Sequence, residues 1–221
     1  MSAMPAPQRS ADPWIGAVGS AEILQRLKHA TRERHVALER RLPLLDPLLS
    51  QEAYRQFLGR FFGFYAPLEL SLFGSPAWHE TGPLYFERRK TPRLALDLIA
   101  LGAAPDALTA LARCRELPDV TSGARLFGCL YVIAGATLGG QIITRHLNAQ
   151  LGLTPQSGAL FFSGYGEQTG SRWKAFGVQL TAFAQRSGGE DDDEIIAAAN
   201  QTFATITGWL FPKPHAAWSL A

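Results

Sequence analysis

The sequence has few cysteines and no long hydrophobic run, and each absence excludes a class of protein. Its 221 residues contain two cysteines, Cys114 and Cys129, which lack the C-x-x-C spacing of thiolate metal sites. This argues against a disulfide scaffold and favours a reducing cytoplasm, with both thiols as small buried side chains. No stretch reaches the ~18 uninterrupted apolar residues that a membrane span needs, so we expect no membrane segment.

The chain also has little excess charge and few signs of β-structure. Its 21 lysines and arginines nearly balance 19 acidic residues, and a net charge of +2 does not indicate a nucleic-acid-binding protein. Alternating Val/Ile/Thr runs are absent, whereas apolar residues recur at three- and four-residue spacing. This pattern predicts an all-α protein with a core large enough to enclose a cofactor.

One domain is expected, over residues 21–212. Residues 1–20 contain three prolines and no apolar core behind a basic start, so they are interpreted as a flexible leader rather than a secretory signal. Residues 213–221 are interpreted as a C-terminal tail.

Caps, prolines and glycines predict where the helices begin and end. Pro67 removes a backbone donor and should end or kink the second helix near Ala66. The helix that opens at Pro105 should end before Pro118, and an uninterrupted helix is expected over 122–151. The expected helices begin, in chain order, at about residues 20, 50, 92, 105, 122, 169 and 190.

Further signals refine these helices. Ser20 and Ser50 are the predicted N-caps of the first two helices. Trp173 is expected on the apolar face of the helix from about 169. The acidic run 190–194 suits the positive N-terminal end of the last helix.

One face of the first helix carries a histidine and two cations. At 100° per residue, Lys28, Arg32, His35 and Glu39 fall within a narrow arc. Beside this arc lies an apolar stripe made of Leu24, Leu27, Thr31, Leu38 and Leu42. A porphyrin is a flat apolar disc with a central metal and two carboxylates on one edge, so this face fits a haem. The alternative is an ordinary boundary histidine on a solvated helix, whose cations pair with Glu33 and Glu39.

A second helix has a face without side chains. Gly128, Gly135 and Gly139 stand at offsets 0, 7 and 11, and Gly140 follows directly. Each glycine inside a helix costs about 0.8–1 kcal/mol relative to alanine, so a close contact must offset the cost. That contact is either tight helix packing or a flat ligand against bare backbone, with a bend at the last two glycines. Together with His35, the second alternative gives a haem between two helices.

With these motifs in order, the chain resembles the haem oxygenase family from Leu24 to about Leu210. Residues 27–39 resemble the family's proximal helix, and residues 135–141 resemble its kinked distal helix. Shorter similar stretches lie at 64–69, 84–86 and 165–176, the last of them typical of the bacterial branch associated with bacteriophytochromes. The resemblance implies a multi-helical single domain with haem between the proximal helix and the kinked distal helix.

The resemblance also implies roles for individual residues. His35 would bind the haem iron, and Lys28 and Arg32 would meet the propionates. The full cofactor-binding set is Lys28, Arg32, His35, Glu39, Tyr65, Arg172 and Lys174, and the catalytic positions are Gly135, Gly139 and Gly140. For Arg172 and Lys174, solvated surface cations are an equally good interpretation.

Two positions depart from the family pattern. Many members carry an aspartate after the first distal glycine and some carry an arginine one turn earlier, whereas this chain has Ala136 and Val132. Either another group, such as Tyr65 or Gln141, holds the distal waters, or the protein binds haem without opening it. The second alternative makes it a haem carrier or sensor. A third, an all-α hydrolase that uses Cys129, lacks an obvious partner residue.

The activity that the resemblance implies is oxidative opening of haem, which is both cofactor and substrate, to biliverdin, carbon monoxide and ferrous iron. The reaction consumes O₂ and electrons. The sequence shows no flavin- or nucleotide-binding fingerprint, so we expect an external ferredoxin or flavin reductase as the donor. The expected location is the cytoplasm, with no nucleic-acid or membrane partner.

Overall fold

The computed structural model describes residues 21–81, 85 and 89–212, and every regular element in this part of the chain is helical. The elements are α1 (Ala21–Arg41), η1 (Pro43–Leu45), α2 (Gln51–Phe73), α3 (Trp78–Thr81), α4 (Thr91–Ala100), α5 (Ala107–Ala110), α6 (Gly123–Gly135), α7 (Gly140–Leu151), η3 (Gly166–Gln168), α8 (Thr169–Arg186) and α9 (Asp192–Leu210). The all-α prediction is confirmed. The predicted leader, the tail and the Ser20 cap lie outside the described residues.

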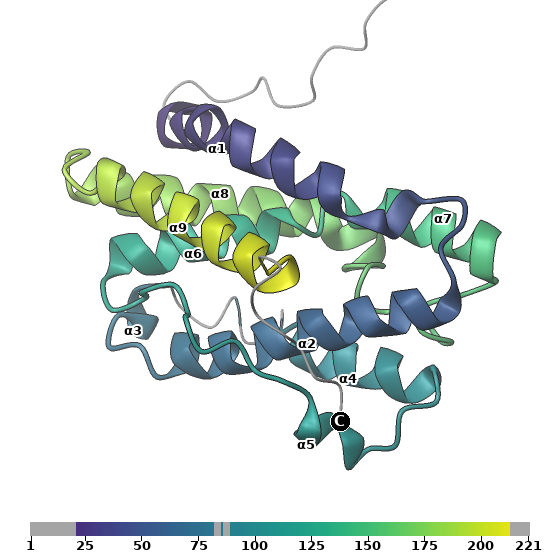
Figure 1. The fold of residues 1–221 in the computed structure, drawn as a ribbon. Coiled ribbons are helices and arrows are strands. Elements are labelled where there is room, and N and C mark those ends of the chain that lie inside the picture. Colours follow the sequence, from purple (N-terminus) through teal and green to yellow (C-terminus); the bar gives the residue numbers. More distant parts are fainter. Residues whose placement is uncertain (1–20, 82–84, 86–88, 213–221) are drawn as a thin grey trace, which may run out of the picture.

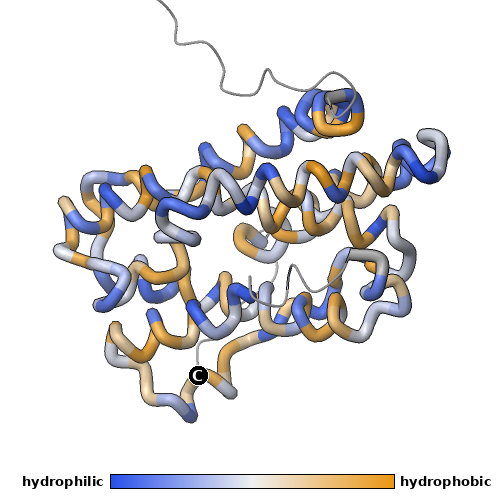
Figure 2. Tube along the Cα trace, turned by 180° about the vertical axis from the view of Figure 1, so that it is seen from behind, coloured by the Kyte–Doolittle hydropathy of each residue, from blue (hydrophilic) through white to orange (hydrophobic). Residues whose placement is uncertain are grey.

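The helices form two layers (Figure 1). Helices α2, α4 and α5 lie on one side, and α1, α6, α8 and α9 lie on the other. Helix α9 joins the layers, because it packs against α6 and α1 and also against α2. Hydrophobic and hydrophilic segments alternate along most helices in Figure 2, as expected for helices with one buried side.

Helix α2 continues through its proline, so of the two expected outcomes, an end near Ala66 or a kink, the end is wrong. A proline cannot donate to the carbonyl four residues earlier, which here belongs to Gly63. The N–H of Cys114 donates to that carbonyl instead, at 2.9 Å. The approach is possible because Gly63 has no side chain: a Cβ there would lie 2.3 Å from the carbonyl oxygen of Ala112. A distant segment therefore satisfies the group that Pro67 leaves unpaired.

The same segment explains why the helix at Pro105 is short. As expected it ends before Pro118, but α5 covers only Ala107–Ala110, and Leu111 is extended, with φ −60° and ψ 136°. Arg113 donates to the carbonyls of Leu108 and Leu111, so side-chain bonds replace the helical ones. The chain then crosses α2 instead of continuing as a helix.

The predicted continuous helix over 122–151 is interrupted. Helix α6 ends at Gly135 and α7 begins at Gly140, with turn residues between them. We call these residues, 136–139, the distal kink. Within it the N–H of Leu138 donates to the carbonyl of Gly135, a three-residue spacing that is typical of hinges inside helices. The predicted stop at Gly152 is confirmed by its positive φ of 69°.

By length and composition the stretch Gly123–Leu151 could cross a membrane, the only one among the described residues to pass this test. Half of its most apolar window is buried inside the fold. Core helices of soluble proteins pass the same test, so the finding is weak support for a membrane segment.

The acidic start of α9 connects this helix to both of its neighbours. Arg26 on α1 pairs with Asp192 and, at 2.7 Å, with Asp193. Arg125 on α6 pairs with Glu194, also at 2.7 Å. The acidic run was predicted to suit the positive end of the helix, and the structure adds ion pairs that hold α1 and α6 to α9.

Candidate functional site

Helix α1 presents its predicted apolar stripe to α8 and α9 and leaves the adjacent face open. Ile23, Leu27, Thr31 and Leu38 are buried. Lys28, Arg32, His35 and Glu39 are exposed, and they share one face as predicted.

His35 lies at the edge of this face, with 52% of its side chain exposed. Its Nε2 is 3.3 Å from Oε1 of Glu39, one turn later. The ring of Phe203 on α9 lies 5.7 Å from the imidazole, centroid to centroid. Histidines that bind metals usually pair their second ring nitrogen with a carboxylate or carbonyl, which fixes the ring and raises its basicity. Glu39 supplies that partner and leaves the other nitrogen to a ligand.

Three residues join α1, α6 and α8 near this histidine. Burial raises the pKa of Tyr131 on α6, and a hydrogen bond with Thr31, one turn before His35, partly offsets that rise. The ring of Trp173 on α8 lies 5.7 Å from that of Tyr131. Helices α1 and α6 therefore meet at a polar contact that lies beside an indole.

The distal glycines have different surroundings. A Cβ on Gly135 would meet the Trp173 ring at 3.5 Å, whereas a Cβ on Gly139 would meet nothing within 4 Å. The apolar side chains of Leu138 and Ile142, on either side of Gly139, are 36% and 55% exposed. This stretch therefore combines bare backbone with exposed apolar surface.

Gly128 and Gly140 serve close packing. A Cβ on Gly128 would lie 2.3 Å from the carbonyl oxygen of Ile195 on α9, and one on Gly140 would lie 2.1 Å from that of Phe162. The structure thus places Gly140 against a loop and not beside the open space at Gly139. The close-packing interpretation of the glycine stripe therefore applies to Gly128 and Gly140, whereas Gly139 has open space beside it.

The remaining predicted cofactor residues lie on two elements, α2 and α8. Tyr65 on α2 is 1% exposed and packs against Phe161, so its hydroxyl lies in the core. Arg172 on α8 lies over the Tyr165 ring, 4.7 Å from its centroid. Lys174 is exposed.

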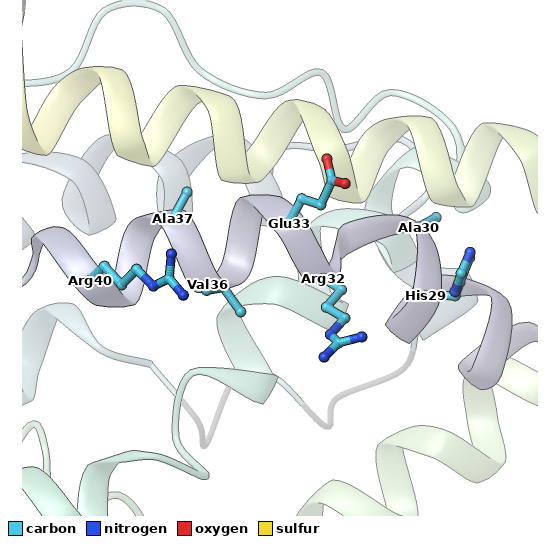
Figure 3. Close-up of a pocket in the computed structure, with 7 residues that line it drawn as sticks. All are labelled: His29, Ala30, Arg32, Glu33, Val36, Ala37 and Arg40. Carbon is cyan, nitrogen blue, oxygen red and sulfur yellow. The ribbon is translucent and has the colours of Figure 1, made fainter.

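A cavity of about 670 Å³ lies along α1 (Figure 3). It is lined by His29, Ala30, Arg32, Glu33, Val36, Ala37 and Arg40, all of α1. At 100° per residue Glu33 and Ala37 lie opposite His35, and only Arg32 belongs to both sets. We therefore place the candidate site on the His35 face, where a histidine and its carboxylate partner stand.

Comparison with known proteins decides the family. Residues 21–210 match the family model described as Heme oxygenase. A curated heme oxygenase of Xanthomonas campestris pv. campestris (strain 8004) is 31% identical over 159 residues, which are 71% of this chain and 87% of that protein. The chain belongs to the haem oxygenase family.

Solved structures agree with this assignment at the level of the fold. The NO- and CO-bound heme oxygenase from Neisseria meningitidis matches with a TM-score of 0.71 and 24% identity, over 85% of this chain and 89% of that one. Heme oxygenase 2 from Chlamydomonas reinhardtii, solved without heme, matches with a TM-score of 0.66 and 20% identity, over 89% and 99%.

The two positions that depart from the family pattern, Ala136 and Val132, have different surroundings. Ala136 lies exposed in the distal kink, and Val132 is buried in α6 at 6% exposure. A valine at position 132 therefore packs in the core, while Ala136 leaves the exposed side of the kink without a charge.

Sequence reasoning missed Tyr131, Trp173 and Phe203 as site residues. Tyr131 stands one turn before Gly135, so helical spacing could have placed it on the same face. Trp173 was assigned to the apolar face of its helix, which is correct but incomplete. No sequence pattern indicated that Phe203 lies near His35, because this contact depends on how α9 packs against α1.

Proposed function

We propose that this chain is a haem oxygenase that binds haem between α1 and the distal kink. Its family membership supports the oxidative opening of haem to biliverdin, carbon monoxide and ferrous iron. The observation that carries the proposed site is the His35–Glu39 pair on an exposed face of α1, because a carboxylate partner on one ring nitrogen is typical of a histidine that binds a metal.

The described residues fit haem in three respects. Half of the His35 side chain is accessible. Gly139 has open space where a side chain would lie, and the exposed Leu138 and Ile142 offer apolar surface to a flat ring. Arg32 and Lys28 lie on the histidine's face, within reach of two carboxylates.

Bound haem supplies the iron at which O₂ is activated and the ring that is opened. His35 would bind the iron, and Glu39 would fix the orientation of the imidazole. Lys28 and Arg32 bind the propionates and so limit in-plane rotation of the ring. Gly139 lets the distal backbone approach closely, and the Trp173 indole covers Gly135 and excludes water from that side.

Proton supply differs from the pattern of family members that carry a carboxylate. Ala136 offers only a methyl group, so we propose that ordered water on the exposed side of the distal kink delivers protons. Gln141 is exposed beside the kink and can hold such water with its amide. Tyr65, in the core, can act only through intervening groups.

Electrons come from an external ferredoxin or flavin reductase in this proposal, and the protein works in the cytoplasm with neither a nucleic-acid nor a membrane partner. Exposed cations on α1 give an acidic donor a surface for docking near the haem edge. Arg172 and Lys174 remain candidates for additional propionate contacts.

Hemin titration tests the site. Wild-type protein should give a saturable Soret band typical of histidine ligation, and His35→Ala should abolish or strongly weaken it. His29→Ala is the matched control, because His29 is exposed on another face of the same helix. An unchanged Soret band in His35→Ala would refute the assignment of the iron ligand.

A second experiment separates an oxygenase from a haem carrier or sensor, the alternative that Ala136 favours. The haem complex is given a reductant and O₂ with catalase present. Loss of the Soret band with growth of a biliverdin spectrum is the expected result. A Soret band that persists through many additions of reductant would instead identify a carrier.

A further inference from the structure

The distal kink is supported by a loop from outside its own helix. We call residues 158–165 the supporting loop. A Cβ on Gly140, the residue directly after the kink, would lie 2.1 Å from the Phe162 carbonyl oxygen, so the loop touches the backbone where the kink ends. A Cβ on Gly164 would lie 3.6 Å from the carbonyl oxygen of Thr137, inside the kink. The position of the kink therefore depends on the position of this loop.

A buried carboxylate on α4 holds the supporting loop. Asp97 is 1% exposed. One carboxylate oxygen accepts the N–H of Leu160 at 2.8 Å, and the other accepts that of Phe161 at 2.7 Å. These are the two residues immediately before Phe162. A buried carboxylate that accepts two consecutive amides fixes both the position and the direction of the chain there.

Further bonds from the same layer hold the rest of the loop. Arg93, one turn before Asp97, donates to the carbonyl of Gly164 at 2.6 Å. The Lys90 ammonium donates to the Tyr165 hydroxyl at 3.0 Å, and the Tyr54 hydroxyl of α2 donates to the Gly158 carbonyl at 2.9 Å. Helix α4 packs against α2, so the loop is anchored in the layer opposite α1.

We propose that Asp97 is a positioning residue for the reaction: by holding the supporting loop it sets where the distal kink stands over haem. Asp97 binds the N–H groups of Leu160 and Phe161, which precede Phe162. The Phe162 carbonyl in turn lies against Gly140. The inference rests on the proposed function, because the kink matters to the reaction only if haem lies against it. None of these residues touches haem in this proposal.

Three variants test the proposal. Asp97→Ala removes both acceptors, and Asp97→Asn keeps the size and one acceptor. Arg93→Ala releases the other end of the loop without touching Asp97's bonds, and it keeps the proposal testable if Asp97→Ala does not fold. Leu108→Ala in α5 is the control for a general loss of stability that does not involve the loop, because it removes a buried side chain elsewhere in the fold.

The first measurement is hydrogen–deuterium exchange of the haem-free protein. Exchange should rise in peptides covering 158–165 and also in those covering 136–142, most in Asp97→Ala and less in Asp97→Asn. Leu108→Ala should leave both peptides unchanged. Faster exchange in the loop without any change at 136–142 would overturn the proposal, because the loop would then not hold the kink.

The second measurement is a single turnover of the haem complex with analysis of the biliverdin isomers. The haem affinity of the variants, measured by Soret titration, should stay within about twofold of the wild-type value. Their rate of biliverdin formation should fall by about 10- to 100-fold, since a shift of about 1 Å in the geometry of the site can cost that much. The isomer ratio should also change, which lost stability alone does not cause. An unchanged ratio in Asp97→Ala and Arg93→Ala, with an active wild type, would refute the inference. A wild type that makes no biliverdin would refute the proposed function instead.

Discussion

At the scale of single residues, identical amino acids have different roles along the stretch that contains α6, the distal kink and α7. Gly128 and Gly140 permit backbone contacts with α9 and with the supporting loop, whereas Gly139 faces open space. Helical spacing places residues on a face but does not say what lies opposite that face. The absence of a Cβ therefore predicts a close approach without identifying its partner.

This difference predicts opposite effects for two adjacent substitutions. Gly140→Ala should destabilise the protein by about 1–3 kcal/mol, because the new methyl meets a backbone carbonyl that cannot rotate away. Gly139→Ala should leave the haem-free protein as stable or up to about 1 kcal/mol more stable, since its φ of −74° suits alanine. Urea unfolding of both variants measures these changes.

The same pair reports on the haem site. Although Gly139→Ala should fold well, it should lower the rate of biliverdin formation because its methyl lies where the ring must approach. If Gly139→Ala were fully active, haem would not lie against this backbone.

At the scale of the element, local sequence signals predict a helix boundary where neighbouring residues alone decide it. They fail where a distant segment of the chain supplies a hydrogen bond. Ser50 caps α2 by accepting the N–H of Ala53 at 3.1 Å, as the sequence predicted. The passage of α2 through Pro67 was not predictable, because Cys114, far along the chain, satisfies the Gly63 carbonyl.

The cap gives an element-scale prediction. Ser50→Ala should cost about 1 kcal/mol of unfolding free energy, because an N–H in the first turn of α2 loses its acceptor. Ser71→Ala, inside the same helix, removes the same hydroxyl without removing a cap and should change stability by less than about 0.5 kcal/mol. Equal losses in the two variants, measured by urea unfolding, would argue against the capping role.

At the scale of the whole molecule, the two layers are joined by buried polar groups as well as by apolar packing. Burial raises the pKa of Asp97 from 3.8 to about 6, and the N–H groups of Phe161 and Leu160 and the charge of Arg93 only partly offset this. The charged form of this carboxyl is therefore costly in the folded state, although the bonds that it accepts hold the supporting loop.

Stability should consequently depend on pH through this residue. Because the pKa is higher in the folded than in the unfolded chain, the folded state binds the proton more tightly. This contribution is fully present below about pH 4 and is lost as pH rises through about 6, by up to about 3 kcal/mol. The unfolding free energy of wild type minus that of Asp97→Asn should therefore fall between pH 4 and 7. Parallel pH profiles for the two proteins would contradict the shift.

The sequence by itself determined the helical class, most helix starts and the shared face of Lys28, Arg32, His35 and Glu39, because all of these depend on neighbours within a few turns. Only the tertiary structure decided which glycines face open space, that Trp173 covers Gly135 and that Phe203 lies beside His35. It also decided that Asp97 holds the loop behind the distal kink. These contacts join residues far apart in the chain, and their geometry depends on how whole helices pack, which no local pattern encodes.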